Sequence, residues 1–180
     1  TAAAYGAHVA SRTRVTALLR DGDRVVGATV KDLESGRELD VRARAVVNAT
    51  GVWTDETQNL AGERGQFHVR SSKGVHLVVP RDRIRGEAGL VLKTEKSVLF
   101  VIPWDRHWII GTTDTDWNLS KDHPAASAKD IDYLLDHVNK VLVEPLYHDD
   151  VLGVYAGLRP LLAGEDASTS QLSREHAVST

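Results

Sequence analysis

The most constraining feature of the sequence is a run of short apolar segments separated by polar links. Residues 74–80 (GVHLVVP), 89–95 (GLVLKTE), 97–104 (SVLFVIPW) and 107–114 (HWIIGTTD) follow one another in quick succession. Each segment has the length of a strand, and links this short favour antiparallel neighbours. We therefore expect an antiparallel sheet with at least one buried face.

A helix is expected after these strands. Residues 127–143 (SAKDIDYLLDHVNKVLV) place apolar side chains at intervals of three and four, which forms one stripe on a helix. The stripe comprises Ile131, Leu134, Leu135, Val138, Val141 and Leu142. Ser127 followed by Asp130 is the pattern of a capping box at the helix start.

Two further extended segments follow the helix. Residues 151–162 (VLGVYAGLRPLL) predict a strand that stops at Pro160, because the residue before a proline is pushed toward an extended backbone. After a polar loop, residues 171–178 (QLSREHAV) resume extended character.

The first third of the chain predicts a meander of short strands. Its β-branched residues are interrupted by turn signals at Gly22 and Gly36. The last predicted strand, residues 42–50 (RARAVVNAT), leads to Gly51 and to a polar helix start at residues 54–56. This end of the meander is a strand-turn-helix unit, typical of nucleotide-binding folds, yet no glycine-rich fingerprint precedes it.

Composition limits the fold and the partners. A chain of 180 residues that is 42% hydrophobic can bury a core, and polar, glycine-containing residues 61–72 indicate a crossing between two regions. We expect an α+β fold with a first domain over residues 1–60 and a second over residues 61–180. A net charge of -3 argues against nucleic acid as a partner, and the absence of cysteine excludes thiolate metal sites within this chain.

No apolar stretch approaches the roughly 20 residues that a membrane-spanning helix needs. The chain begins at Thr1 and contains no Met, so we expect a piece of a longer protein.

Several polar residues have two interpretations from the sequence alone. Arg159 lies between apolar neighbours, where its guanidinium serves either an internal salt bridge or an anionic ligand. His76 alternates with Val75 and Leu77 and is either a structural residue or a pocket-lining imidazole. Gly51 permits either a simple turn or the close approach of a phosphate or ribose.

The acidic segments favour turns over metal sites. Asp114 and Asp116 are two residues apart among threonines, a pattern that satisfies its own backbone as readily as it binds a cation. Residues 147–150 (YHDD) lack the helical spacing of a zinc protease. We predict no metal site.

The order of motifs resembles the FAD-dependent glycerol-3-phosphate dehydrogenases, within the flavoproteins built like D-amino acid oxidase. The matching stretches are RARAVVNATGVW, SSKGVHLVVP, VLFVIPWDRHWIIGTTDTDW, GVYAGLRPLL and SREH, and they occur in the order of the family. IGTTDTD followed by GLRPL is the most specific part. The resemblance covers nearly the whole chain, from about Tyr5 to His176.

The resemblance implies a site for each domain. The first domain becomes a partial FAD-binding domain, with Ala49, Gly51 and Trp53 near the cofactor and Val15 near its adenine. From the sequence alone, a core valine is the favoured interpretation of Val15. The second domain becomes the substrate domain with the start of the return to the FAD domain, and Arg159 anchors the substrate while His76 binds it or assists proton removal.

The resemblance also implies a reaction. The parent oxidises sn-glycerol 3-phosphate to dihydroxyacetone phosphate, and electrons pass through FAD to a quinone. It implies a cytoplasmic protein with peripheral attachment to the inner face of the cytoplasmic membrane. Two alternatives stay open: a glycerophosphate oxidase with oxygen as acceptor, and a noncatalytic binding fragment without flavin.

Overall fold

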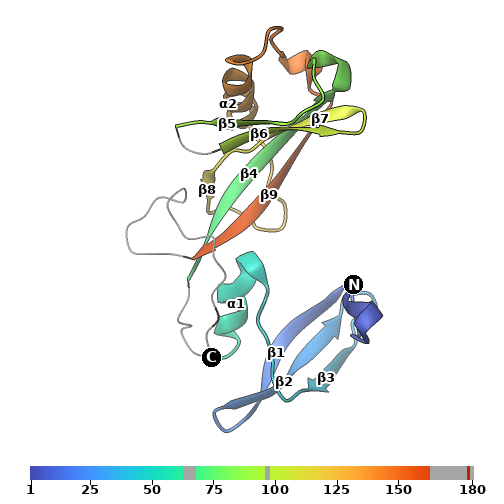
Figure 1. Ribbon diagram of the computed structural model, residues 1–180. Coiled ribbons are helices and arrows are strands. Elements are labelled where there is room, and N and C mark those ends of the chain that lie inside the picture. Colours follow the sequence, from blue (N-terminus) through green and yellow to red (C-terminus); the bar gives the residue numbers. More distant parts are fainter. Residues whose placement is uncertain (63–67, 96–97, 163–177, 179–180) are drawn as a thin grey trace. The chain divides into compact units, whose positions relative to one another are not determined.

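The computed structural model describes residues 1–62, 68–95, 98–162 and 178, and the chain forms two compact units, Thr1–Gln66 and Phe67–Thr180 (Figure 1). The sequence placed the boundary after residue 60. Antiparallel sheets and helices make up both units, so the expected α+β fold is confirmed.

The first unit is a three-stranded antiparallel meander followed by a short helix. After a 3-10 turn at Ala2–Tyr5, its strands are β1 (Thr13–Asp21), β2 (Arg24–Asp32) and β3 (Glu38–Arg42), paired in that order. A 3-10 turn, Gly51–Trp53, then leads into α1 (Thr54–Asn59). These elements agree with the expected meander and helix start.

The two predicted turns lie where glycine can take a left-handed backbone. Gly22 has φ 59° between β1 and β2, and Gly36 has φ 74° between β2 and β3. At the second turn the Asp32 carboxylate accepts hydrogen bonds from the Ser35 hydroxyl and the Glu34 amide. These bonds hold the pKa of Asp32 below its usual value and fix the turn.

The expected strand over residues 42–50 is wrong for most of its length, because β3 ends at Arg42 and residues 43–50 are irregular. A strand requires a continuous hydrogen-bonding neighbour, and among the described residues no strand pairs with this segment beyond one bond, from the Ala43 amide to the Val26 carbonyl at 2.9 Å. Val47 is consequently 83% exposed despite the apolar pattern.

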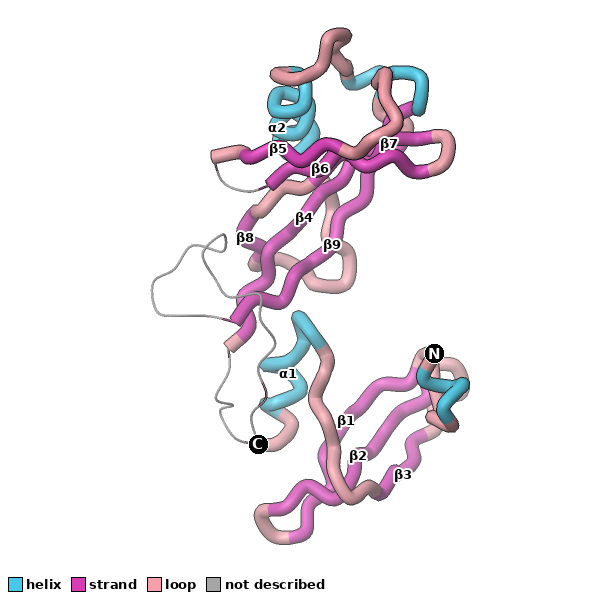
Figure 2. Tube along the Cα trace, viewed as in Figure 1, coloured by secondary structure: helices cyan, strands magenta, loops and turns pink. Residues whose placement is uncertain are grey.

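The second unit is built on a twisted sheet in the order β5-β6-β7-β4-β8, with β9 also paired to β4 (Figure 2). Its strands are β4 (Val69–Pro80), β5 (Leu90–Lys93), β6 (Val98–Trp104), β7 (His107–Gly111), β8 (Thr115–Trp117) and β9 (Gly153–Leu162). Short 3-10 turns occupy Arg81–Arg83 and His148–Asp150. All pairings are antiparallel. The short links predict this for β5–β6 and β6–β7, whereas β4 pairs with strands distant in the sequence.

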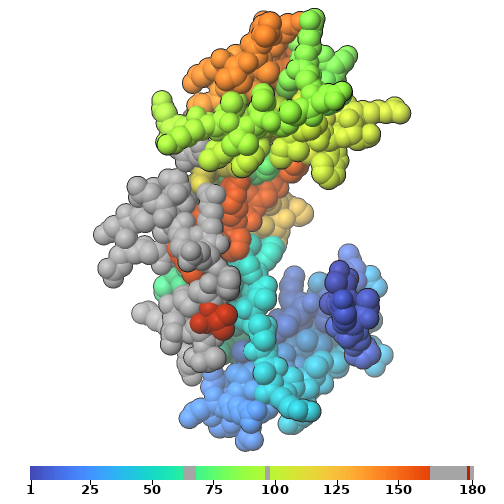
Figure 3. Space-filling model, viewed as in Figure 1, coloured from blue at the N-terminus to red at the C-terminus, as the bar shows by residue number. Residues whose placement is uncertain are grey.

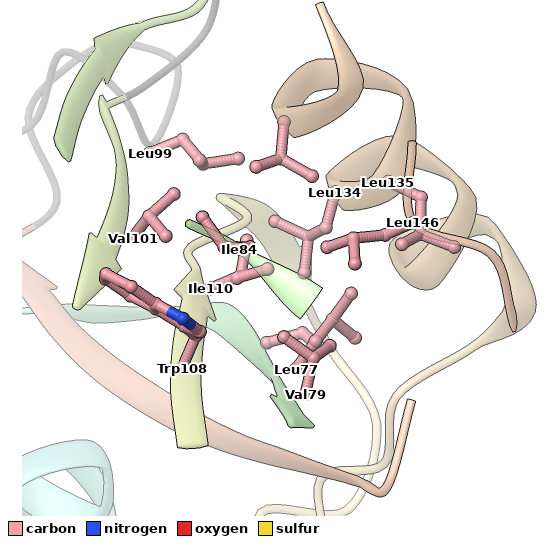
Figure 4. Close-up of a cluster of buried hydrophobic side chains, with 12 residues drawn as sticks. Leu77, Val79, Ile84, Leu99, Val101, Trp108, Ile110, Leu134, Leu135 and Leu146 are labelled. Carbon is pink, nitrogen blue, oxygen red and sulfur yellow. The ribbon is translucent and has the colours of Figure 1, made fainter. Parts of the chain in front are cut away.

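One face of this sheet carries the hydrophobic core, covered by α2 (Ala128–Asn139) (Figure 4). Alternate residues of the strands meet the apolar stripe of the helix. The buried cluster includes Val75, Leu77, Val79, Leu99, Val101, Trp108, Ile110, Leu134, Leu135 and Val138. Val141 and Leu142, which the sequence placed on the stripe, both lie beyond the helix end. Val141 is 50% exposed, and Leu142 packs partly buried against the core.

The start of α2 is tied to the sheet through a buried charge. The Asp130 carboxylate accepts hydrogen bonds from the Ser127 amide at 2.8 Å and the Ser127 hydroxyl at 2.7 Å, so the predicted Ser127–Asp130 capping pair is present. The same oxygen lies 2.6 Å from the ammonium of Lys73 on β4. Lys73 also donates to the Ala125 carbonyl at 3.1 Å.

The segment after the helix is fastened to the loop after β4 by two ion pairs. Arg83 pairs with Asp150 at 2.7 Å, and Arg85 with Glu144 at 3.1 Å. Figure 3 shows the orange surface of the later segment beside the green surface of the loop.

Two sequence expectations differ in detail. Pro160 does not stop its strand: β9 continues to Leu162, and Pro160 is opposite Ser71. Proline is tolerated there because β9 has β4 as its only partner among the described strands, so its outer edge needs no donor. The predicted turn after β7 contains a short strand, β8, and residues 171–177 lie outside the described residues.

Candidate functional site

The sheet face opposite α2 carries the two predicted substrate residues. Side chains alternate along β4, so burial of Val75 and Leu77 against the helix turns His76 to the other face. On β9, Arg159 is opposite Ser72 of β4. Ser72, Gly74 and His76 are spaced two residues apart along β4, so they lie on the same face. His76 and Arg159 therefore share one face of the same sheet.

Arg159 is half-buried and its guanidinium reaches across β4 toward the end of β7. Its Nη2 donates to the Thr112 hydroxyl at 2.7 Å, and its Nη1 donates to the Thr113 carbonyl at 3.2 Å. Both acceptors are uncharged oxygen atoms. A planar guanidinium held in this way suits a phosphate or carboxylate ligand.

The acceptors of Arg159 are themselves fixed to β4. Thr113 is buried, and its hydroxyl accepts from the Val75 amide at 3.1 Å and donates to the Lys73 carbonyl at 3.4 Å. The segment after β7 is thereby locked against the central strand. Thr112 and Thr113 of this segment position Arg159, which follows them by 47 and 46 residues in the sequence.

His76 forms a stacked pair with Tyr155 of β9. Their ring centroids are 4.9 Å apart with an interplanar angle of 9°, and the two residues are opposite each other in the strand register. Burial and, secondarily, the positive charge of Arg159 lower the pKa of His76 below its usual value of 6.5. The imidazole is thus predominantly neutral at pH 7 and can accept a proton.

Two glycines make room for these side chains. A Cβ atom on Gly74 would lie 2.2 Å from Nη2 of Arg159, and one on Gly111 would lie 2.2 Å from Cδ2 of His76. Real Cβ atoms do not approach so closely, so the space above each glycine is occupied by the neighbouring side chain. The absence of a side chain at each position is part of the site.

In the first unit, the NATG segment forms a loop organised by Asn48. The Asn48 side-chain oxygen accepts from the Thr50 hydroxyl at 2.7 Å and the Thr50 amide at 3.3 Å. Its amide nitrogen donates to the Thr54 carbonyl at 3.1 Å, and the Thr54 hydroxyl donates to the Gly51 carbonyl at 2.7 Å. This one side chain joins the loop to the first turn of α1.

The predicted cofactor residues of this unit are accessible. Ala49 is exposed in the loop, Gly51 has φ 60°, and Trp53 is 40% exposed at the end of the 3-10 turn. Val15 lies on β1 and is 40% exposed, so it is not a core valine. A glycine with a left-handed backbone beside exposed main chain is compatible with close approach of a nucleotide.

The structure brings the predicted residues into two groups. Ala49, Gly51 and Trp53 belong to one loop of the first unit, and His76 and Arg159 to one sheet face of the second. Val15 belongs to neither group and lies on β1. The sequence reasoning missed Thr112 and Tyr155. The signal for Tyr155 was its spacing of four from Arg159 along a predicted strand, which places both on one face.

The acidic residues of the TTDTD segment contact β4. Asp114 accepts from the Ser72 hydroxyl at 2.5 Å, and Asp116 pairs with Arg70 at 2.9 Å. Within the part of the chain that the structure describes, no group of three or more His, Asp or Glu is arranged to hold a metal ion. None of the helices in that part is both long and apolar enough to span a bilayer.

A pocket of about 300 Å³ lies away from this face, between β5 and the end of α2. Lys93, Glu95, His137 and Lys140 are among its lining residues. The carboxyl-terminal end of a helix disfavours anions, and the pocket contains none of the predicted site residues. The chemistry of the sheet face therefore identifies the candidate site better than the size of this hollow does.

The family is decided by comparison with known proteins. The model of the FAD-dependent oxidoreductase family matches residues 1–176. The chain belongs to this family. FAD is the cofactor of the family, and the exposed loop around Gly51 is compatible with it.

Individual relatives agree with the resemblance to glycerol-3-phosphate dehydrogenases, which is confirmed. The chain is 66% identical to "Glycerol-3-phosphate dehydrogenase 2" of Mycobacterium tuberculosis, over 99% of this chain and 30% of that protein. It is 36% identical to "Alpha-glycerophosphate oxidase" of Streptococcus pneumoniae, over 91% of this chain and 28% of that protein.

A solved structure has the same fold. The glycerol-3-phosphate dehydrogenase from Bacillus halodurans, complexed with FAD, is 33% identical and superposes with a TM-score of 0.83 over 90% of this chain and 33% of that one. The chain thus spans about a third or less of the length of these relatives.

Proposed function

We propose that this chain is the central portion of a flavoprotein that oxidises sn-glycerol 3-phosphate to dihydroxyacetone phosphate. Residues 1–60 are part of its FAD-binding domain, and residues 61–180 are its substrate domain with the start of the return to the FAD domain. The observation that carries the proposal is that Arg159 and His76 lie on one sheet face. A guanidinium held by Thr112 is thus placed near a neutral imidazole.

Each residue has a defined role in this proposal. Arg159 binds the phosphate of the substrate through the edge of its guanidinium, and Thr112 keeps that group in place. His76 accepts the proton of the substrate hydroxyl, for which its lowered pKa keeps it unprotonated at pH 7. Because the two groups lie at different positions of one sheet face, they hold the substrate in one orientation.

The loop around Gly51 contributes to the cofactor site, with Ala49 and Trp53 beside it and Val15 at the adenine. When bound, FAD supplies the redox chemistry by accepting the hydride equivalent from carbon 2. The chain holds the alcohol and removes its proton. Gly51 permits close backbone approach because it has no Cβ, and its φ of 60° is a conformation that other residues adopt only with strain.

The electron acceptor is proposed to be a quinone, with the protein peripherally attached to the inner face of the cytoplasmic membrane. The high identity to a mycobacterial protein named as a dehydrogenase supports this choice over oxygen. The alternative, a glycerophosphate oxidase, draws on the more distant streptococcal relative. Oxygen consumption and quinone reduction by the purified parent, measured in parallel, distinguish the two.

The test of the function is a set of variants in the full-length parent. Arg159→Ala is expected to lower kcat/KM for sn-glycerol 3-phosphate by about 100-fold, since it removes a charged phosphate contact. Arg159→Lys is expected to restore only part of the kcat/KM lost in Arg159→Ala, because an ammonium cannot form the two parallel hydrogen bonds of a guanidinium. Arg85→Ala, at an exposed ion pair of the same unit, is the matched control and leaves kinetics unchanged.

Flavin content separates the remaining alternative, a noncatalytic fragment. The parent is expected to be yellow with bound FAD. Gly51→Ala is expected to lower the ratio of bound flavin to protein. A colourless parent whose turnover does not respond to Arg159→Ala would exclude the proposed function.

A further inference from the structure

Gly157 is a glycine on the candidate face whose outer side is open. It is directly opposite Gly74 in the register of β4 and β9. A Cβ on Gly74 would collide with the guanidinium of Arg159, whereas a Cβ on Gly157 would have no heavy atom of the described residues within 4 Å. Arg159 therefore covers one member of this glycine pair and leaves the other uncovered.

The open position is bordered on both sides by polar side chains. Along β9, Tyr155, Gly157 and Arg159 are two residues apart and share one face. Tyr155 stacks on His76, whose ring lies over Gly111 toward β7. The guanidinium leans in the same direction, toward Thr112.

The spacing suits a short molecule. Residues four apart on a strand are separated by roughly 13 Å between their Cα atoms. The guanidinium of Arg159 lies over Gly74, and the His76–Tyr155 pair is two residues further along the strands, so the two polar ends are separated by roughly 7 Å, the length of a few carbon atoms. One end presents a cation, and the other presents an imidazole and a phenol.

We propose that Gly157 is a specificity-determining residue that forms the floor under the carbon chain of a small polyol phosphate. The phosphate lies at Arg159 and the hydroxyl-bearing carbons lie over Gly157, with a hydroxyl directed at His76. This inference rests on the proposed function and adds which backbone position sets the size of the substrate. A methyl group at residue 157 would occupy the volume of the carbon chain.

The inference makes different predictions for the two opposed glycines. Gly157→Ala introduces a methyl group into open space at an ordinary backbone conformation, so folding is unaffected and substrate binding is weakened. Gly74→Ala displaces the Arg159 guanidinium, so it weakens binding of every anion. Gly153→Ala is the matched control, because its Cβ would make only an ordinary contact of 3.9 Å with Val78.

The experiment uses the parent holoenzyme and inorganic phosphate as a competitive inhibitor. In Gly157→Ala, KM for sn-glycerol 3-phosphate is expected to rise at least about tenfold, the effect of one methyl group in a fitted pocket, while the inhibition constant of phosphate stays constant. In Gly74→Ala both constants rise. In Gly153→Ala neither changes.

Three results would overturn the inference. The first is an equal rise of KM and of the phosphate inhibition constant in Gly157→Ala, which places the phosphate over this residue. The second is a thermal midpoint for Gly157→Ala as low as that for Gly74→Ala, which means that the space is filled. The third is unchanged kinetics in Gly157→Ala while Arg159→Ala is impaired; if Arg159→Ala is also unimpaired, the proposed function itself fails.

Discussion

The ammonium of Lys73 lies 2.6 Å from the carboxylate of Asp130, and both side chains are almost completely buried between β4 and the start of α2. Lys73 also lies 5.1 Å from the ring centroid of Trp117. The neighbouring residue on β4 is Gly74, over which Arg159 lies. Lys73 and Gly74 are adjacent and point to opposite faces of β4. The buried ion pair therefore fixes the strand beside the glycine over which Arg159 lies.

Breaking this pair is expected to destabilise the second unit. Lys73→Met leaves the Asp130 carboxylate buried without its partner, and such a loss costs about 3–5 kcal/mol of unfolding free energy. Urea denaturation of the chain measures it. Arg85→Met, which removes an exposed ion pair of the same unit, is the control and should change the midpoint little. Equal stability of Lys73→Met and the unsubstituted chain would contradict the expectation.

The same pair predicts an acid dependence of stability. Burial raises the pKa of Asp130, but hydrogen bonds from Lys73 and Ser127 outweigh it, so the pKa is below its usual value of 3.8. The unfolded chain then binds the proton more readily, and the contribution present above pH 3.8 is lost as pH falls through the folded pKa. The stability difference between the unsubstituted chain and Asp130→Asn should therefore shrink as pH is lowered. A difference independent of pH would contradict this.

The coupling between His76 and Arg159 is measurable without turnover. Burial and the charge of Arg159 lower the pKa of His76, so removing the charge in Arg159→Met should raise it toward 6.5. A titration of the His76 ring by NMR gives both values. Arg85→Met again serves as control. If the His76 titration is the same in all three proteins, the two side chains do not share one face in solution.

Close packing in the first unit gives a stability test of its own. A Cβ on Gly27 would lie 2.2 Å from the Val41 carbonyl oxygen of the paired strand, so Gly27→Ala must separate β2 from β3. We expect a loss of about 1–3 kcal/mol, the usual effect of overpacking. Hydrogen exchange of the β2 and β3 amides detects it. Gly153→Ala should leave those amides unchanged, and retained protection in Gly27→Ala would show that the strands adjust.

Local patterns determined most of the elements. The alternation in residues 74–80 placed Val75 and Leu77 on one face and His76 on the other, and the stripe from Ile131 to Val138 formed a helix. These predictions depend only on neighbours in the chain, because side-chain direction repeats with a period of two in strands and 3.6 in helices. The same reasoning wrongly predicted a strand over residues 43–50, because a strand exists only when another strand supplies its hydrogen bonds.

The sequence by itself determined that this chain has antiparallel sheets, one covering helix, and Arg159 and His76 as candidates for ligand binding. Only the tertiary structure decided that β9 pairs with β4, that Thr112 holds Arg159, and that Gly74 and Gly111 lie beneath the two side chains. The reason is physical: a strand pairing between distant segments is chosen by the burial and hydrogen bonding of the whole sheet, and no local spacing encodes it. A glycine that makes room for a side chain from another strand has the same local signature as one that only makes a turn.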